Sequence, residues 1–139
     1  MSQDMIMNPN ATILIVDDEE LVLKSLRREL ASLEGVRLLM AGSGPEALAL
    51  LRLQPVQVVL TDHRMPEMSG VELLEEVKKI SPETTRMMMT GFADLSTAMA
   101  AINKGEIFRF IVKPWKHDEL LKALSEALDR AASPPGDQS

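Results

Sequence analysis

Two hydrophobic periods alternate along the chain. Short apolar runs, rich in β-branched and large aliphatic residues, have the length and composition of buried strands. Between them lie longer segments in which apolar residues recur every three or four positions, as they do on one face of a helix. The predicted strands are TILIV (12–16), VRLLM (36–40), VQVVL (56–60), TRMMM (85–89) and FRFIV (108–112). The predicted helices occupy about 19–33, about 44–53, a segment that follows Ser69, about 94–104 and about 117–131.

Local signals mark several helix ends. Ser43 with Glu46, and Ser69 with Glu72, have the spacing of a capping box. In that motif the serine hydroxyl and the glutamate carboxylate both bond to backbone N–H groups at the start of a helix. Gly105 is the expected end of the fourth helix.

The strand–helix repeats predict a doubly wound α/β domain. Strands that are apolar on both sides belong to a parallel sheet that helices cover on both faces. In such sheets ligands bind beyond the carboxyl ends of the strands, near the point where the strand order reverses. We expect one domain over 12–131, an N-terminal extension over 1–11, and a flexible tail or the start of a linker over 132–139.

Composition and charge narrow the classes of partner. The 139 residues are 45% hydrophobic and 26% charged, which is a globular balance for one domain. The net charge of −6 opposes direct nucleic-acid binding and favours a metal cation or a basic protein. The chain has no cysteine, which excludes disulfides and thiolate metal sites. Because it also lacks a membrane-spanning apolar run and a signal-peptide pattern, we expect a cytoplasmic protein without membrane contact.

Acidic residues gather where two predicted strands end. Asp17 and Asp18 follow the first strand and Asp62 follows the third, and these strands are neighbours in the common doubly wound orders. Three close carboxylates raise one another's pKa unless a cation intervenes. Mg²⁺ prefers oxygen ligands and is usually held by one or two carboxylates plus phosphate oxygens. The cluster therefore predicts both a metal and a phosphoryl group.

Two further strand ends supply hydrogen-bond donors. Lys113 ends the fifth strand and Thr90 follows the fourth, so both can reach the same carboxylate or phosphoryl oxygens. The Lys113–Pro114 peptide is a candidate for the cis form, which would aim the lysine inward. With Asp62 as the nucleophile, these residues match what aspartyl phosphorylation requires.

Each of these residues taken alone has a simpler interpretation. An acidic pair after a strand is more often a helix N-cap, and a lysine before proline is usually a surface residue. Their coincidence at one edge of one sheet favours the functional interpretation. Met87, Met88 and Met89 are predicted to fill the core, and His63 and His117 are predicted to be solvated or capping residues.

The motifs together resemble the receiver domain of two-component response regulators over about 12–131. They are VDDEE (16–20), VVLTDHRMPEMSGVELL (58–74), MMTGFAD (88–94) and FRFIVKPW (108–115), and their order and spacing are highly specific. The resemblance implies a flavodoxin-like, five-stranded parallel sheet in the order 2-1-3-4-5. It also implies transfer of a phosphoryl group to Asp62 from a phosphohistidine on a sensor histidine kinase or phosphotransfer protein.

The resemblance further implies a metal site. Asp17, Asp18, Asp62 and the backbone carbonyl of Arg64 would be the protein ligands of Mg²⁺, for which Mn²⁺ could substitute. Lys113 would pair with the phosphoryl oxygens.

A switch is implied as well. Thr90 would move toward the phosphate and Phe110 would turn inward behind it. The change would be read on the surface of helix 94–104, strand 108–112 and helix 117–131, which could also form a homodimer.

Some positions depart from the commonest family pattern. Arg64 and Phe92, two residues after Asp62 and Thr90, flank the path of the attacking water, so we expect slow self-dephosphorylation. Phe110 stands where tyrosine is frequent. The motif around it is similar to receivers joined to cyclic-dinucleotide phosphodiesterase or other output domains.

Two alternatives from other classes stay open. A pseudo-receiver would use the fold as a constitutive binding module, and its usual mark is loss of the acceptor aspartate or the lysine, both of which are present. A Mg²⁺-dependent phosphohydrolase would need an Asp-x-Asp pattern and a cap insertion, whereas position 64 is arginine. We therefore expect a phosphoacceptor that modifies only itself and is not an enzyme acting on metabolites.

Overall fold

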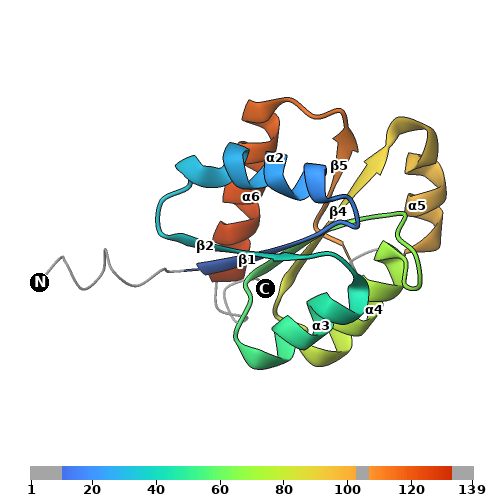
Figure 1. Ribbon diagram of the computed structural model, residues 1–139, viewed down its shortest axis with the longest axis horizontal. Coiled ribbons are helices and arrows are strands. Elements are labelled where there is room, and N and C mark those ends of the chain that lie inside the picture. The colour runs from blue at the N-terminus through green and yellow to red at the C-terminus, as the bar shows by residue number, and fades with distance from the viewer. Residues whose placement is uncertain (1–10, 103–106, 133–139) are drawn as a thin grey trace, which may run out of the picture.

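Five parallel strands form one sheet in the order β2-β1-β3-β4-β5, as predicted (Figure 1). The computed structural model describes residues 11–102 and 107–132. The strands are β1 (Ala11–Val16), β2 (Val36–Ala41), β3 (Val58–Asp62), β4 (Thr85–Gly91) and β5 (Arg109–Lys113). Residue 11 of the predicted extension belongs to β1, and residue 132 of the predicted tail belongs to the last helix. The rest of both segments, like Gly105, lies outside the described residues.

The helices follow the predicted order, and two of them end differently from the prediction. They are α2 (Glu20–Glu29) with the 3-10 turn η1 (Leu30–Ser32), α3 (Gly44–Leu53), α4 (Gly70–Ile80), the 3-10 turn η2 (Phe92–Asp94) with α5 (Leu95–Ala101), and α6 (His117–Ala132). The segment predicted as a helix over 19–33 is thus α-helical to Glu29 and ends in a 3-10 turn. The segment predicted over 94–104 is helical from Leu95 to Ala101, and its last two residues lie outside the described part of the chain.

Serine caps begin two helices. Ser69 accepts the N–H of Glu72 at 3.2 Å while the Glu72 carboxylate accepts the N–H of Ser69 at 2.9 Å, so the predicted capping box is complete. Ser43 accepts the N–H of Glu46 at 3.2 Å, but the Glu46 carboxylate accepts from Gly42 at 2.7 Å instead of from the serine. The hydroxyl bond of the predicted Ser43 box is therefore confirmed. The carboxylate of Glu46 binds the backbone one residue before the serine.

Three strands run further toward the functional edge than the hydrophobic pattern indicates. Asp62 of β3 pairs with Met89 of β4. Thr90 and Gly91 of β4 pair with Val112 and Lys113 of β5. The polar residues Asp62, Thr90 and Lys113 lie at or next to the ends of these strands, and a pattern of apolar residues alone stops before them. The consequence is that the sheet itself, and not a loop, fixes the backbone of the polar residues at this edge.

Alternate strand residues face opposite layers of helices. Ile13 and Ile15 pack in the core with α2 and α6, whereas Leu14 and Val16 pack in the core with α3, α4 and α5. Figure 1 shows these two helix layers on the two sides of the sheet. The three methionines at 87–89 are fully buried on β4, as predicted, with two facing α2 and α6 and one facing the other layer.

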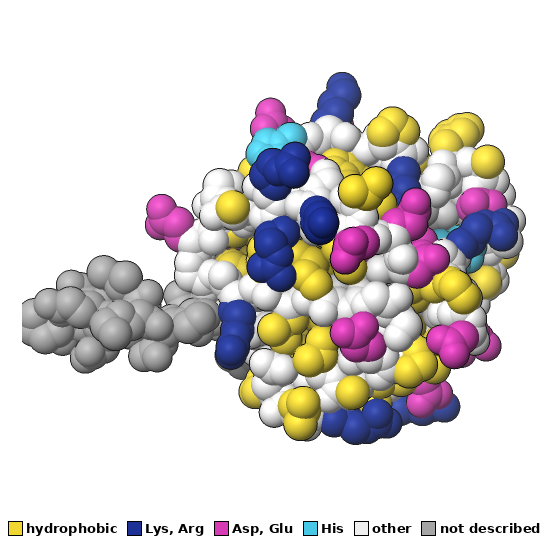
Figure 2. Space-filling model, viewed as in Figure 1, with side chains coloured by type: hydrophobic (Ala, Val, Ile, Leu, Met, Phe, Trp, Pro, Cys, Tyr) yellow, Lys and Arg dark blue, Asp and Glu magenta, His cyan; other side chains and the backbone are white. Residues whose placement is uncertain are grey.

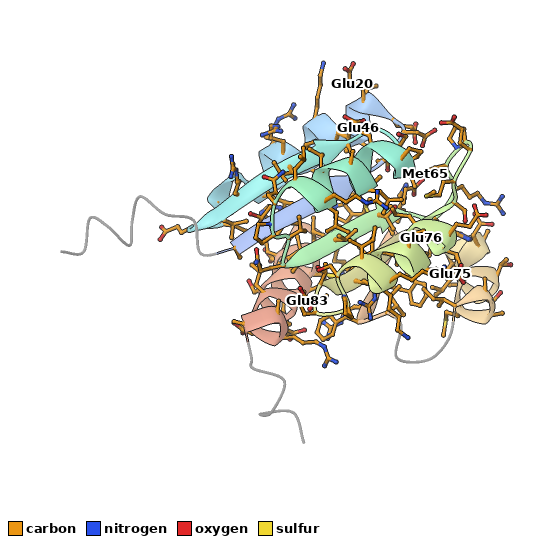
Figure 3. The ribbon with its side chains drawn as sticks, turned by 90° about the horizontal axis from the view of Figure 1, so that it is seen from below. Glu20, Glu46, Met65, Glu75, Glu76 and Glu83 are labelled. Carbon is orange, nitrogen blue, oxygen red and sulfur yellow. The ribbon has the colours of Figure 1, made fainter. Side chains whose placement is uncertain are left out.

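Among the described charged residues only Asp17 and Asp62 are buried, and the others keep contact with solvent. Glu20, Glu46, Glu75 and Glu83 are exposed on helix surfaces and turns (Figure 3). Basic side chains gather over α2, whose last turn carries Arg27 and Arg28, and acidic side chains lie mainly over the right half of the same view (Figure 2). Among the described helices, none is long and apolar enough to cross a membrane.

Candidate functional site

Asp17 directly follows β1 and is fully buried. Its backbone N–H bonds to the carbonyl of Ala41 at 3.1 Å, which ties it to the end of β2. Oδ1 accepts the N–H of Glu19 at 2.8 Å. Oδ2 is also buried, and within residues 11–102 and 107–132 it has no hydrogen-bond partner. A buried carboxylate oxygen without a donor is unfavourable, so this atom points to a ligand or a charge that completes the site.

Asp62 ends β3, and the loop after it is held tightly. The N–H of His63 bonds to the carbonyl of Met89 at 3.0 Å, and the N–H of Gly70 bonds to the carbonyl of His63 at 2.9 Å. A Cβ atom at Gly70 would lie 2.2 Å from the carbonyl oxygen of Asp62, so only glycine allows α4 to start this close to the strand. The start of α4 thereby fixes the loop that follows Asp62.

Lys113 ends β5 and points into the acidic group. Its Nζ donates to Oδ1 of Asp62 at 2.7 Å and lies 3.7 Å from Oδ2 of Asp17. The side chain is 28% exposed, so part of the ammonium keeps contact with water. The peptide between Lys113 and Pro114 is cis, as the sequence suggested.

The charges of this group shift two pKa values. Burial raises the pKa of Asp17 to about 6; the Glu19 N–H and Lys113 oppose this rise, and the charges of Asp62 and Asp18 add to it. Burial lowers the pKa of Lys113, but its hydrogen bond to Asp62 and the acidic charges around it outweigh that effect, so the net shift is upward. Lys113 therefore keeps its charge at neutral pH, whereas Asp17 holds its proton to a higher pH than a solvated aspartate does.

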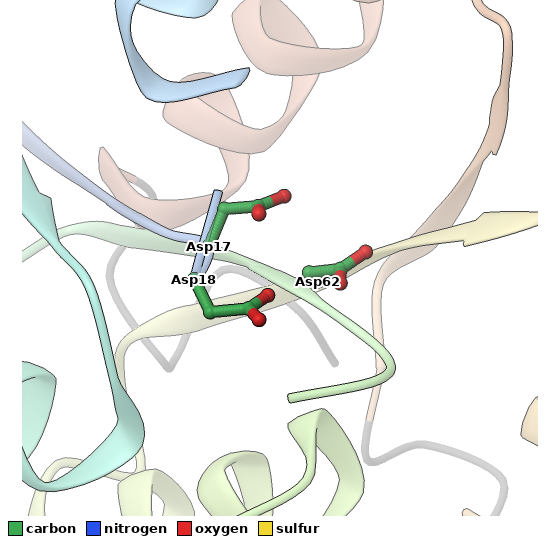
Figure 4. Close-up of side chains that lie close together, drawn as sticks. All are labelled: Asp17, Asp18 and Asp62. Atoms are coloured by element: carbon green, nitrogen blue, oxygen red, sulfur yellow. The ribbon is translucent and has the colours of Figure 1, made fainter. Parts of the chain in front are cut away.

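Asp17, Asp18 and Asp62 form one acidic cluster (Figure 4). Each offers one carboxylate oxygen, and these atoms lie within 4.8 Å of one another. Asp18 is exposed, whereas the other two are buried, so the cluster opens to solvent on one side. An all-oxygen set with one exposed side fits a hard divalent cation that keeps some of its water. The unpartnered Oδ2 of Asp17 supports the same fit.

Thr90 follows Met89, the residue that pairs with Asp62 at the end of β3. Its side chain is buried, and Oγ1 lies 3.4 Å from Nδ1 of His63 and 3.5 Å from the carbonyl of Gly91. His63 was expected to be a solvated or capping residue, and it is instead half-buried beside the threonine hydroxyl. Phe110 is half-buried against the core of the α3, α4 and α5 layer.

Three side-chain pairs join residues that are distant in the sequence. Arg64 binds Asp94 through two hydrogen bonds. Glu29 accepts from the indole N–H of Trp115 at 3.1 and 3.2 Å, and it lies 3.2 Å from Nδ1 of His117. The sequence predicted no contact for Glu29 or Asp94, because an isolated acidic residue in or next to a helix is usually solvated.

Comparison with known proteins identifies the family. The family model described as the response regulator receiver domain matches residues 13–125. This chain belongs to the response regulator receiver family. The hydrogenase transcriptional regulatory protein HoxA of Cupriavidus necator is 42% identical over 119 residues, covering 86% of this chain and 24% of that protein. The transcriptional regulatory protein GlrR of Escherichia coli is 37% identical over 122 residues, covering 88% of this chain and 27% of that protein.

A solved receiver has the same fold over nearly its whole length. The signal receiver domain of an HD domain-containing protein from Pseudomonas fluorescens Pf-5 matches with a TM-score of 0.82 and 39% identity, covering 89% of this receiver and 98% of that chain. The predicted fold and the predicted role as a receiver of two-component signalling are thus confirmed. The receiver spans about a quarter of the length of the curated relatives it matches.

Proposed function

We propose that Asp62 accepts a phosphoryl group from a phosphohistidine on a sensor histidine kinase or phosphotransfer protein. The observation that carries the proposal is the 2.7 Å contact between Lys113 and Asp62 beside two further carboxylates. In the transfer, a carboxylate oxygen of Asp62 forms the O–P bond while the N–P bond of the donor breaks. The electron pair of that bond stays on the departing imidazole nitrogen.

The acidic cluster would hold the metal that this transfer needs. Asp17, Asp18, Asp62 and the backbone carbonyl of Arg64 are the proposed ligands of Mg²⁺, with Mn²⁺ as a substitute. When bound, the ion supplies positive charge to the carboxylates and to the phosphoryl oxygens. The buried Asp17, whose pKa lies at about 6 without an ion, is the residue that gains most from that charge.

The ammonium group of Lys113 and the hydroxyl of Thr90 would then change hydrogen-bond partners. Lys113 moves from Asp62 to a phosphoryl oxygen and keeps its charge paired. Thr90 turns from His63 toward the same group and donates its hydroxyl hydrogen. Phe110 follows into the space behind it. The surface of α5, β5 and α6 thereby takes a second arrangement, which is the signal read by a partner or by a second copy of the chain.

The lifetime of the phosphorylated state is a further expectation. Arg64 and Phe92 lie two residues after Asp62 and Thr90, and their side chains are 70% and 81% exposed, so we propose that both flank the path of the attacking water. We expect slow self-dephosphorylation, and faster loss of the group when both residues are replaced by alanine. Equal lifetimes of the two proteins would contradict the shielding role.

The partners beyond the kinase follow from the relatives. HoxA and GlrR are transcriptional regulators, and we propose that this receiver likewise controls a transcriptional output located in the cytoplasm. An HD-domain output is the second candidate, because the Pseudomonas fluorescens receiver has that context at similar identity. The receiver itself makes no direct nucleic-acid contact, since its net charge is −6.

Phosphorylation can be tested on the purified protein. Incubation with acetyl phosphate and Mg²⁺ is expected to add about 80 Da to the intact mass, as one phosphoryl group does. Asp62→Asn should abolish the adduct. Asp118→Asn, which changes an exposed aspartate in the first turn of α6, should keep it. No adduct on the wild-type protein would favour the pseudo-receiver, and steady release of phosphate from an added monoester would favour the phosphohydrolase.

A further inference from the structure

A bidentate ion pair joins the two loops that flank the proposed phosphorylation site. Nε of Arg64 donates to Oδ2 of Asp94 at 3.0 Å, and Nη2 donates to Oδ1 at 2.7 Å. Arg64 lies two residues after Asp62, in the loop that leads to α4. Asp94 is the last residue of η2, four residues after Thr90. The pair therefore connects the loop between β3 and α4 (the acceptor loop) with the segment that follows Thr90, the proposed switch threonine.

Asp94 stands at the N-cap of α5 without capping it. Its backbone is helical, with φ −102° and ψ −2°, and its carboxylate makes no capping hydrogen bond. Ser43 and Ser69, by contrast, have extended backbones and cap α3 and α4 with their hydroxyls. Aspartate is among the best N-cap residues, but a capping residue has an extended backbone. Both the helical backbone of Asp94 and its pairing with Arg64 therefore keep the carboxylate from the first amides of α5, and capping requires Asp94 to turn to the extended region once Arg64 has left.

The helix that lacks this cap has little else to stabilise it. α5 has only 7 residues, from Leu95 to Ala101, and none of them is charged. Short helices are marginal without capping or side-chain pairs, and their stability then depends on packing. Only Ala98 of this helix is fully buried. A capping bond at its start would therefore change the order of α5 appreciably.

Arg64 has both the room and the reach to change its partner. Its side chain is 70% exposed, and it lines a 500 Å³ pocket together with His63, Met65, Pro66, Ser69 and Thr97. Two residues along a chain lie within about 7 Å of each other, which an arginine side chain can span. A phosphoryl group on Asp62 would place about two negative charges there, against one on Asp94, and guanidinium binds phosphate oxygens in the same bidentate way.

We propose that Arg64 exchanges Asp94 for the phosphoryl group when Asp62 is phosphorylated, and that the released Asp94 then caps α5. This rests on the proposed function and names the regulation of that site. The acceptor loop thereby controls the order of α5 directly, in addition to any movement of Thr90. Phe92, which is 81% exposed on η2, is carried by the same rearrangement.

The competition for Asp94 is tested first in the unmodified protein by amide hydrogen exchange. A capping carboxylate accepts the N–H of the second or third helical residue, here Ser96 or Thr97. In Arg64→Ala the carboxylate is free, and exchange at these amides is expected to slow by about fivefold. Asp94→Ala and the double variant should show no slowing. Asp94→Asn loses the charge pair and keeps a capping oxygen, so it should behave as Arg64→Ala does.

A matched control is Lys79→Ala, which removes another exposed cation from an ion pair, here with Glu76 at 3.2 Å on α4. It should leave exchange at Thr97 unchanged. Wild-type exchange at Ser96 and Thr97 in Arg64→Ala would overturn the proposal, because it would mean that Arg64 does not keep Asp94 from the helix.

The exchange of partners is tested after treatment with acetyl phosphate or beryllofluoride and Mg²⁺. In the wild type the Nε–H resonance of Arg64 should shift, and exchange at Thr97 should slow by the same factor as in Arg64→Ala. Asp94→Ala should keep the Arg64 shift and lose the slowing. An adduct without either change would overturn the proposal while leaving the phosphorylation of Asp62 intact. Absence of the adduct would refute the proposed function itself, and the competition seen in the unmodified protein would still decide the role of Arg64.

Discussion

Asp17→Asn is expected to stabilise the metal-free protein at neutral pH. Asp17 is fully buried, and one of its oxygens has no hydrogen-bond partner within the described residues. Asparagine has the same shape, and its side-chain oxygen can still accept the N–H of Glu19. The substitution removes a buried negative charge from between Asp62 and Asp18, at the expense of a 3.7 Å attraction to Lys113.

The magnitude follows from the pKa of Asp17. Its pKa rises from 3.8 to about 6 on folding, and at about 1.36 kcal/mol per unit this amounts to about 3 kcal/mol. The raised pKa means that the folded state binds the proton more tightly. The penalty is therefore absent below 3.8, grows between 3.8 and about 6, and is complete above that range. The shift already includes the attraction to Lys113, so we expect a gain of about 3 kcal/mol at neutral pH and little gain near pH 4.

Urea unfolding in the presence of a chelator, followed by circular dichroism from about pH 4 to about pH 8, measures this difference. Asp18→Asn is the matched control, because Asp18 is an exposed member of the same cluster. It should change the free energy of unfolding by less than about 0.5 kcal/mol. Mg²⁺ should stabilise the wild type more than it stabilises Asp17→Asn. Equal stability of wild type and Asp17→Asn at every pH, or a loss of stability in the variant at neutral pH, would refute the reasoning.

Two other substitutions test what holds the site in place. Gly70→Ala places a Cβ atom 2.2 Å from the carbonyl oxygen of Asp62, and we expect a loss of more than about 2 kcal/mol in thermal unfolding together with slower labelling by acetyl phosphate. Gly91→Ala, whose added Cβ meets nothing within 4 Å, is the control and should be nearly neutral. Glu29→Ala removes the acceptor of the Trp115 indole N–H, so the fluorescence spectrum should change and stability should fall by about 1 kcal/mol. An unchanged spectrum would mean that the bond is absent in solution.

Much of the fold could be predicted because its signals are local. The two hydrophobic periods, the serine caps and the alternation of strands with helices each depend on neighbouring residues, and parallel crossovers leave few ways to combine them. The strand ends were less accurate: β3, β4 and β5 run on through Asp62, Thr90 and Lys113 because pairing with neighbouring strands continues past the apolar residues. Hydrogen bonding between strands does not depend on side-chain polarity.

The sequence by itself determined which chemistry the functional edge holds. Asp17, Asp18, Asp62 and Lys113 follow or end predicted strands, and parallel strands bring their carboxyl ends to one edge. Which side chain binds which was decided only by the tertiary structure. Arg64 and Asp94 are 30 residues apart in the chain, and their pairing depends on the exact positions of two loops. Loop paths and rotamers depend on packing with distant residues, and a one-dimensional pattern carries no information about them.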